Sequence, residues 1–232
     1  MKISGSIALV TGANRGLGKQ FVTTLLERGA TKVYATARRP ELIDVPGVET
    51  LRLDVTDPDS VAAAAAAAQD VTLLINNAGI ATGQNLITGD LSEIRREMDT
   101  HYFGTLAVIR AFAPRLAGGA ILNVLSALSW FSYPGANAYA AAKSAEWSLT
   151  NGVRLELAAQ DTLVTGLHLG AADTDMSARF DGPKISPEQV VTAALDGIEE
   201  NRLEVLADDW SRRVKASLAG DPSAFYAPDP TA

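Results

Sequence analysis

Short runs rich in Val, Ile and Leu recur along the chain and alternate with segments of helical pattern. The runs cover residues 7–10, 32–36, 48–53, 73–76, 120–126, 163–169 and 203–206. Strands that alternate with helices in this way are typical of a parallel sheet, because each connection must cross from one end of the sheet to the other. The pattern therefore predicts an α/β fold with a parallel sheet covered by helices on both faces.

The helical segments carry their own start and stop signals. Gly29 is a C-terminal stop for the first helix, while Asp57 and Pro58 form an N-cap and first-turn signal for the second. The second helix contains seven consecutive alanines, which have high helix propensity. The predicted helices cover residues 16–28, 61–68, 91–116 and 138–159, the third of them as a helix with its continuation.

The composition of the chain limits the number of domains and the class of binding partner that we expect. The chain has 232 residues, 47% of them apolar, with no hydrophilic linker, so a single domain over residues 1–220 is expected. Residues 221–232 are rich in Pro and Asp and are expected to form a loose tail. The net charge of −7 argues against binding to nucleic acid or to an anionic membrane, so we expect a small-molecule partner.

The residue types that are missing also carry information. Without cysteine the chain has no disulfide, no cysteine-ligated zinc and no iron–sulfur cluster, and we expect no metal site. There is no hydrophobic signal core at the N-terminus, and no apolar run approaches the roughly 18 to 20 residues that span a bilayer. A cytoplasmic protein is the expectation.

A glycine-rich turn follows the first predicted strand. Gly12, Gly16 and Gly18 stand between that strand and the first helix, in the spacing Gly-x-x-x-Gly-x-Gly. Glycine lets the backbone turn tightly and approach a pyrophosphate, whose charge is favoured at a helix N-terminus. The turn therefore predicts a dinucleotide-binding site, although a simple strand-to-helix turn is the alternative.

The end of the second strand bears on which dinucleotide binds. An NAD enzyme places an acidic residue there against the ribose 2′-hydroxyl, but this sequence reads Ala35-Thr36-Ala37-Arg38-Arg39. Arg38, and Arg15 inside the glycine turn, are suited to bind a 2′-phosphate through charge-assisted hydrogen bonds. We therefore expect NADP(H); the alternative is that the two arginines are solvated loop charges.

Three residues indicate proton transfer. Tyr139 and Lys143 are four apart in a predicted helix, so they share one face, and Ser126 precedes the tyrosine by thirteen residues. A nearby ammonium favours the phenolate and lowers a phenol pKa that starts near about 10. A tyrosine tuned in this way exchanges a proton with a carbonyl or alcohol oxygen near neutral pH. Together with the glycine turn, this indicates hydride chemistry on a nicotinamide cofactor.

With these motifs in order, and with Asp54 and Asn76-Asn77-Ala78-Gly79 between them, the chain resembles the short-chain dehydrogenase/reductases over roughly residues 5–210. The resemblance implies a Rossmann-type, doubly wound, seven-stranded parallel sheet. It also implies that Tyr139 is the proton donor or acceptor, that Lys143 lowers its pKa and holds the nicotinamide ribose, and that Ser126 hydrogen-bonds the substrate oxygen.

The same resemblance implies further contacts. Asp54 and Val55 border the adenine, Asn77, Ala78 and Gly79 line the cleft, and Thr174 and the Ala172 backbone hold the carboxamide. The cofactor-binding residues expected in all are Gly12, Asn14, Arg15, Gly16, Leu17, Gly18, Arg38, Asp54, Val55, Asn77, Ala78, Gly79, Tyr139, Lys143, Ala172 and Thr174.

Two positions depart from the family pattern. His101 stands where the family usually has an asparagine that is thought to organise a water relay to the lysine. Because histidine both donates and accepts hydrogen bonds, His101 is a candidate catalytic residue, and an imidazole satisfied within a helix junction is the alternative. Leu169-Gly170 replaces the expected Pro-Gly after the sixth strand, which suggests a less fixed loop. His168 is expected to pack in or beside that strand.

Aromatic residues near the catalytic serine suggest the substrate pocket. Trp130 and Tyr133 follow Ser126 closely, and Phe180 lies in the segment expected to cover the substrate. They predict a lining for an apolar or aromatic carbonyl compound, with hydrophobic core or subunit contact as the alternative. The cover is short, so tolerance of bulky ketones is a hypothesis. The long third and fourth predicted helices further indicate a homodimer or homotetramer.

The function expected from the sequence is NADP(H)-dependent reduction of a ketone or aldehyde to an alcohol, or the reverse reaction. Hydride would move between the nicotinamide and the carbonyl carbon while Tyr139 supplies or removes the proton. Two alternatives stay open: a noncatalytic NADP(H)-binding regulatory protein, and a reductase of a cyclic imine with His101 as a proton source.

Overall fold

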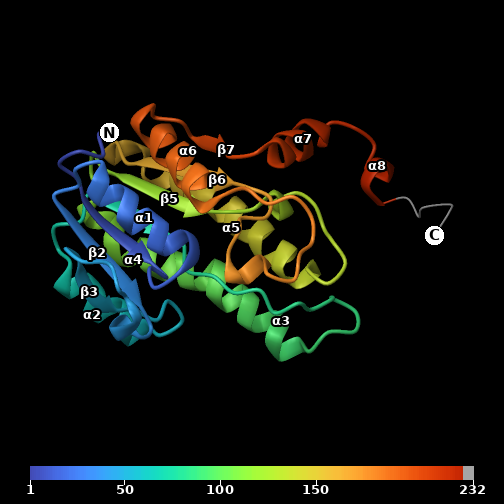
Figure 1. Ribbon diagram of the computed structural model, residues 1–232, viewed down its shortest axis with the longest axis horizontal. Helices are drawn as coiled ribbons and strands as arrows, with labels where there is room; N and C mark the ends of the chain where they lie inside the picture. The colour runs from blue at the N-terminus through green and yellow to red at the C-terminus, as the bar shows by residue number, and fades with distance from the viewer. Residues whose placement is uncertain (227–232) are drawn as a thin grey trace.

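A computed structural model of the protein describes residues 1–226. It has a seven-stranded, entirely parallel sheet in the order β3-β2-β1-β4-β5-β6-β7 (Figure 1). The strands are β1 (Ile7–Thr11), β2 (Lys32–Ala37), β3 (Glu49–Arg52), β4 (Leu73–Asn76), β5 (Ala120–Val124), β6 (Leu163–His168) and β7 (Glu204–Leu206). The expected Rossmann-type, doubly wound fold is confirmed, and all seven predicted strands are present with ends shifted by a few residues.

Helices cover both faces of this sheet. They are α1 (Gly16–Glu27), α2 (Pro58–Ala67), α3 (Leu91–Met98), α4 (Thr105–Phe112), α5 (Asn137–Glu156), α6 (Pro187–Glu199), α7 (Asp209–Ser217) and α8 (Ser223–Tyr226). Figure 1 shows α1 and α6 side by side on one face. No helix in the described part of the chain is long and apolar enough to cross a membrane.

Alternate residues of each strand feed two separate cores. Val10 in β1 packs with Val22 of α1 and Val190 of α6, and all three are fully buried. Leu9 points to the opposite face, into a second core that contains Val108 of α4. Because successive side chains of a strand point to opposite faces, one buried strand can hold both helical layers in place.

The C-terminal part of the fold differs from the sequence prediction. Helices α6 and α7 were not predicted, and α8 lies inside the segment that was expected to be a loose tail. The Tyr226 ring of α8 stacks on Phe131 with centroids 5.6 Å apart, and its hydroxyl accepts a hydrogen bond from Ser132 N at 3.1 Å. Residues 223–226 of the expected tail thus form a short helix that contacts Phe131 and Ser132, and residues 227–232 lie outside the described residues.

The connection between α3 and α4 is a π-helical turn, η2 (Asp99–Gly104). It places His101 and Gly104 in the interior of the molecule. A Cβ at Gly104 would lie 2.8 Å from Val55 Cγ2, so only glycine lets this turn pack so closely against the loop after β3. Turns of the π type are rare and often occur at functional sites.

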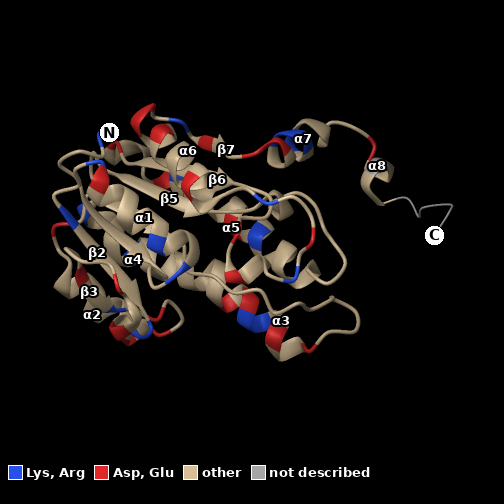
Figure 2. Ribbon diagram, viewed as in Figure 1, with Lys and Arg blue, Asp and Glu red and all other residues tan. Residues whose placement is uncertain are grey.

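Charged residues are distributed over the whole chain. Figure 2 shows Lys and Arg interspersed with Asp and Glu along the helices and loops, and in this view no face carries one sign alone.

Candidate active site

The carboxyl ends of the strands border an open cleft of about 680 Å³. It lies where the chain reverses direction across the sheet, between β1 and β4, which is where parallel α/β sheets bind their ligands. Every expected cofactor-binding residue except Gly18 lines it, as do the expected catalytic residues Ser126, Tyr139, Lys143 and His101. Residues from distant parts of the sequence therefore meet in one cavity.

The glycine turn owes its shape to two close approaches. Gly12 has φ +67°, and a Cβ there would lie 3.0 Å from the Ala78 Cα. Gly18 stands behind the turn, where a Cβ would overlap the Gly12 carbonyl oxygen, which explains why it does not line the cleft. Larger residues at either position would push the turn out of its place.

The turn is tied to the end of β4 by side-chain hydrogen bonds. Asn77 Nδ2 donates to the carbonyls of Thr11 and Gly12 at 2.9 and 3.2 Å. Thr11 Oγ1 accepts from the backbone N–H groups of Asn77 and Ala78, both at 2.9 Å. The motif 76–79 thus fixes the floor of the cleft.

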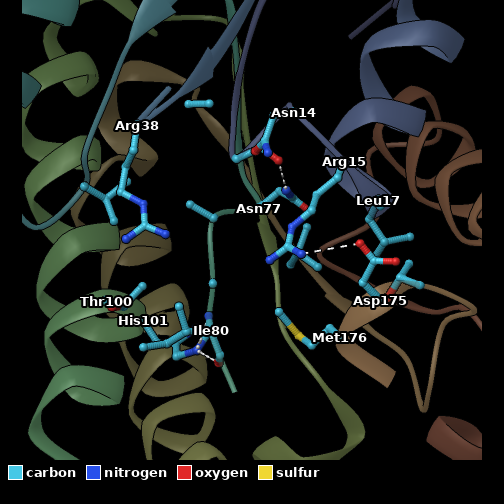
Figure 3. A pocket seen from close by; sticks show the side chains of 18 of the residues that line it. Asn14, Arg15, Leu17, Arg38, Asn77, Ile80, Thr100, His101, Asp175 and Met176 are labelled. Atoms are coloured by element: carbon cyan, nitrogen blue, oxygen red, sulfur yellow. Dashed lines mark hydrogen bonds and ion pairs between the residues drawn. The ribbon is translucent and has the colours of Figure 1, made fainter. Parts of the chain in front are cut away.

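The cofactor end of the cleft fits a phosphorylated dinucleotide. Gly16 is the first residue of α1 and lines the cleft, and a helix N-terminus favours a phosphate. Arg38 is exposed, and within residues 1–226 no acidic side chain forms an ion pair with it. Arg15 lies across the opening and contacts Asp175 at 3.4 Å (Figure 3). The segment after β2 places Arg38 and Arg39, and no carboxylate, in the cleft lining.

Helix α5 presents three polar side chains along one face. Lys143 Nζ donates to Glu146 Oε2 at 2.6 Å and to the Val124 carbonyl at 2.7 Å, and it lies 5.8 Å from the centroid of the Tyr139 ring. Two of the three ammonium protons are thus used inside the protein, which leaves one for a group in the cleft. Sequence reasoning missed Glu146, although its spacing of i+3 from Lys143 places it on the same helix face.

Ser126 is held at the cleft by hydrogen bonds to its side chain and to its backbone carbonyl. It caps the short helix η4 (Ala127–Ser129), where its Oγ accepts a hydrogen bond from Leu128 N at 3.1 Å. The Ser126 carbonyl accepts from His168 Nδ1 at 3.0 Å. The expectation that His168 packs beside a strand is met, because it is fully buried at the end of β6.

The pKa of Tyr139 differs from the expectation. Burial raises the pKa of the phenol above 10, and the Lys143 charge, which acts in the opposite direction as predicted, does not outweigh it. The ring is nevertheless partly exposed to the cleft, so water there weakens the effect of burial. Glu146 and Glu97 raise the pKa further, since their carboxylates repel a phenolate. Tyr139 is therefore protonated at neutral pH and is prepared to act as an acid.

Lys143 and Glu146 form a buried ion pair, and the pKa of each of the two groups is raised. Burial acts to lower the pKa of Lys143, but the Glu146 carboxylate and the Tyr139 phenol raise it above its ordinary value. Burial also raises the pKa of Glu146 in spite of the ammonium. We take the pair as charged at neutral pH because the two atoms are only 2.6 Å apart.

His101 lies at the inner end of the cleft. Its ring meets that of Tyr139 edge to face, with centroids 5.2 Å apart, and its Nε2 lies 2.8 Å from the Ile80 carbonyl oxygen (Figure 3). Burial and the Lys143 charge hold the pKa of His101 well below 6.5, so the imidazole is neutral at physiological pH. A Cβ at Gly79 would come within 2.6 Å of the ring, so glycine makes room for it.

The family assignment follows from this chain's match to the short chain dehydrogenase family model, which covers residues 6–183. The protein is a short-chain dehydrogenase/reductase. A solved short chain dehydrogenase from Burkholderia cenocepacia J2315, in complex with NADP, is 41% identical, with a TM-score of 0.94 and 98% of each chain covered.

Two curated reductases are also similar to this short-chain dehydrogenase/reductase. The NADPH-dependent 1-acyldihydroxyacetone phosphate reductase of Schizosaccharomyces pombe is 33% identical over 74% of this chain, which spans only 61% of that protein's length. Carbonyl reductase [NADPH] 2 of Sus scrofa is 32% identical over 68% of each chain. The family establishes an oxidoreductase that acts on small molecules.

The aromatic side chains expected to line the substrate pocket of this dehydrogenase/reductase lie outside the cleft lining. Trp130 stacks on His168 with centroids 3.8 Å apart, so its ring belongs to the packing behind the site. Tyr133 and Phe180 are 51% and 40% exposed on loops. The apolar cleft residues beside Ser126 and Tyr139 are instead Ile80, Leu125, Leu169 and Met176.

The loop that carries Leu169 is fixed by specific contacts. Leu169 is buried, and its carbonyl accepts from Ala127 N at 2.7 Å. Gly170 N donates to Asp208 Oδ2 at 2.7 Å, and a bridge between Ala172 and Ile185 closes the segment. These contacts restrain the loop, which lacks the proline that the family pattern has at the position of Leu169.

Several other cleft residues were not predicted from the sequence. Arg96 and Thr100 reach the cleft from α3 and η2. Separately, the residues that the structure describes hold no cluster of three metal-ligating side chains. Arg96 pairs with Glu93 at 2.6 Å. In a sequence, a single arginine on an amphipathic helix cannot be distinguished from a solvated charge, because only the fold shows that it faces the cavity.

His168 makes stability dependent on pH. Burial lowers its pKa from 6.5 to about 4, so below pH 6.5 the unfolded chain binds a proton that the folded protein does not accept until about pH 4. The folded state is expected to lose about 2 kcal/mol at pH 5 relative to pH 7 from this residue. Buried His101 acts in the same direction.

The measurement is the free energy of unfolding in urea at pH 7 and pH 5. The His168→Phe variant keeps a flat ring beside Trp130 and is expected to lose less stability on acidification than the wild type. An equal loss in both proteins would contradict the assignment of this pH dependence to His168.

Proposed function

We propose that this protein is an NADP(H)-dependent oxidoreductase that reduces a ketone or aldehyde to an alcohol, or runs the reverse oxidation. The observation that carries the proposal is the convergence of Ser126, Tyr139 and Lys143 on one cleft whose other end is the glycine turn. The bound nicotinamide would supply or accept the hydride. The protein itself would position the carbonyl group and transfer one proton to or from its oxygen.

Tyr139 is the proposed general acid in reduction. Its phenol is protonated at neutral pH, because burial raises its pKa, and it can give its proton to the substrate oxygen as negative charge develops there. Ser126 and Tyr139 both line the cleft, and we propose that the serine hydroxyl donates a second hydrogen bond to the same oxygen. Lys143 stabilises the phenolate that remains, because its charge lowers the pKa of that phenol.

The apolar lining supports a hydrophobic carbonyl substrate. Ile80, Leu125, Leu169 and Met176 line the same cleft as the polar groups, and a pocket of this kind orients one oxygen and binds the rest of the molecule by burial. Met176 is 51% exposed at the rim. We propose that the open rim admits bulky ketones.

We also propose a homodimer or homotetramer in the cytoplasm. A groove of about 440 Å³ between α2 and α4 is lined by Phe103, Leu106, Ala107 and Val61. Phe103 is 56% exposed there, and apolar surface of this kind is typical of subunit interfaces.

Arg38 is proposed to select NADPH over NADH. Replacing it by alanine removes a charge-assisted contact to the 2′-phosphate and is expected to weaken NADPH binding about 10- to 100-fold while NADH binding stays the same. Equilibrium titration of both nucleotides measures this. Arg213→Ala, which replaces an exposed arginine on α7, is the matched control. An unchanged ratio of the two affinities in Arg38→Ala would show that Arg38 is a solvated loop charge.

The test of the function is NADPH oxidation with a panel of ketones, aldehydes and cyclic imines. We expect turnover of apolar ketones and identification of the matching alcohols. NADPH binding without any turnover would favour a regulatory protein, and turnover of the imine but not of its ketone analogue would favour an imine reductase. Turnover restricted to short, charged ketones would contradict the proposal that the cleft binds an apolar substrate.

A further inference from the structure

The peptide group between Leu169 and Gly170 is held at both of its ends. The Leu169 carbonyl accepts a hydrogen bond from Ala127 N at 2.7 Å, and the Gly170 N–H donates to Asp208 Oδ2, also at 2.7 Å. A trans peptide group is planar and rigid, so two such bonds fix its orientation. Because Leu169 and Gly170 both line the cleft, these bonds also fix one part of the cleft wall.

Asp208 lies outside the cleft lining and uses its two carboxylate oxygens for two different contacts. Its Oδ1 accepts from Ser211 N at 2.8 Å, which makes Asp208 the N-cap of α7. Its Oδ2 accepts from Gly170 N instead. One acceptor oxygen is enough to cap a helix, so the helix alone does not account for the second bond. Hydrogen bonds to a carboxylate are stronger than those between neutral groups.

Helix α7 is a firm support for this carboxylate. It follows directly after β7 (Figure 1), and its Val214 side chain is buried. Lys215 of α7 forms an ion pair with Glu204 of β7, and its Nζ lies 5.1 Å from the centroid of the Trp130 ring. These contacts attach α7 to the end of the sheet, so Asp208 is held in place from behind.

Gly170 lies so close to α7 that a larger residue would not fit. A Cβ at position 170 would be 2.9 Å from Asp208 Oδ2 and 3.1 Å from Trp210 Cδ1. Any other side chain would therefore push the loop away from α7 and break the hydrogen bond. Leu169 does not fix φ as a proline would, so the orientation of the peptide group depends on these contacts.

The restrained peptide group lies between two segments that border the cleft. Ala127 directly follows Ser126 and is the first residue of η4, so the Leu169 carbonyl holds the start of that short helix. In the other direction, Gly170 leads to Ala172, which also lines the cleft. A displacement of the peptide group would therefore be transmitted to the segment that carries the proposed hydrogen-bond donor, Ser126.

We propose that Asp208 is a positioning residue of the active site. Its carboxylate holds the peptide group between Leu169 and Gly170, and that peptide group holds the Ser126 segment in place. The proposal rests on the proposed function, in which Ser126 donates a hydrogen bond to the substrate oxygen. Asp208 touches none of the reacting atoms and exchanges no proton with them. It acts through the rigid peptide group, whose carbonyl becomes a better acceptor when its N–H is bonded to a carboxylate.

Three substitutions separate the two contacts of Asp208. Asp208→Ser keeps a cap for α7, because serine is a good N-cap residue, but its single hydroxyl oxygen does not hold Gly170 as well. Gly170→Ala breaks the same bond from the side of the loop and leaves the cap unchanged. Asp57→Ser is the matched control: it makes the same change at the N-cap of α2, where the carboxylate accepts from Asp59 N and lies outside the cleft lining.

The kinetic test uses the full chain with NADPH and a ketone that the wild type reduces. Asp208→Ser and Gly170→Ala are each expected to lower kcat about tenfold while the NADPH dissociation constant changes less than about threefold. Asp57→Ser is expected to keep the kcat of the wild type. The double variant of positions 170 and 208 should be no slower than the slower single variant, because both changes break one contact.

Two kinetic outcomes would overturn the proposal. One is a Gly170→Ala or Asp208→Ser protein with the kcat of the wild type, and the other is a double variant in which the two losses multiply. Urea unfolding of each variant shows whether α7 stays folded. If Asp208→Ser fails to fold, Gly170→Ala decides, because it leaves the cap of α7 intact.

Amide hydrogen exchange in the protein without nucleotide gives a readout that does not depend on turnover. We expect Asp208→Ser to speed the exchange of Gly170 N–H and also of Ala127 N–H, whose acceptor belongs to the same peptide group. Asp57→Ser should change neither. Unchanged exchange at Ala127 would show that the restraint does not reach the Ser126 segment and would overturn the proposal. This measurement decides even if the wild type reduces no carbonyl compound, an outcome that would refute the proposed function instead.

Discussion

Replacing Tyr139 by phenylalanine is expected to lower kcat for carbonyl reduction by about 10²- to 10⁴-fold, the usual contribution of a positioned general acid. The substitution removes one oxygen from a residue of α5 whose ring meets the His101 ring edge to face. The packing of the ring therefore remains, and most of the NADPH affinity should remain with it. Loss of turnover with binding retained is the signature of a group that acts only in the chemical step.

The pH dependence adds a second measurement. Because burial raises the pKa of Tyr139, the acid form is present throughout the neutral range. The rate of reduction is expected to be flat there and to fall only as the pH rises toward the pKa of the phenol, while alcohol oxidation should increase. Tyr133→Phe, a tyrosine exposed on a loop, is the matched control. A Tyr139→Phe protein with the kcat of the wild type would remove the tyrosine from the mechanism.

The second large effect is expected from Lys143→Met, which leaves Glu146 buried without its cation. Removing one partner of a buried ion pair costs about 3–5 kcal/mol of unfolding free energy. Because the pKa of Glu146 is already raised, its carboxylate can become protonated in the variant. We therefore expect the loss of unfolding free energy to lie toward the lower end of this range. Reduction of carbonyl compounds should be abolished as well, since the phenolate loses its nearest positive charge.

A double substitution separates stability from chemistry. Lys143→Met with Glu146→Gln removes both charges, so most of the lost stability should return, but activity should not. Urea unfolding and steady-state kinetics on the same preparations measure the two quantities. Recovered turnover in the double variant would show that the lysine serves only to neutralise Glu146.

The sequence pattern predicted the sheet well because the strands are continuous apolar segments. Val10 and Leu9 enter different cores, and this burial on both faces made β1 recognisable without knowledge of its neighbours. Helix α8 was missed because its contacts are tertiary: the Tyr226 ring rests on Phe131, which lies far away in sequence. Short helices rarely form without such support.

The candidate site was predicted in its residues but not in its electrostatics. The spacing of Tyr139 and Lys143 placed them on one helix face, yet the pKa of the phenol depends on how deeply the fold buries it. Glu97 and Glu146 read as ordinary helical charges, because a sequence does not reveal that two helices turn them inward toward His101. Trp130 is absent from the cleft lining, and its ring stacks on His168 of strand β6, a contact that the sequence does not reveal.

The most direct test of the central claim follows the hydride itself. NADPH carrying deuterium at nicotinamide C4 is incubated with the protein and a ketone that it consumes, and the alcohol is analysed for the position of the label. The account predicts deuterium on the carbinol carbon with the wild type and none above background with Tyr139→Phe. Unlabelled alcohol, or label transfer that is equally fast without the tyrosine hydroxyl, would contradict it.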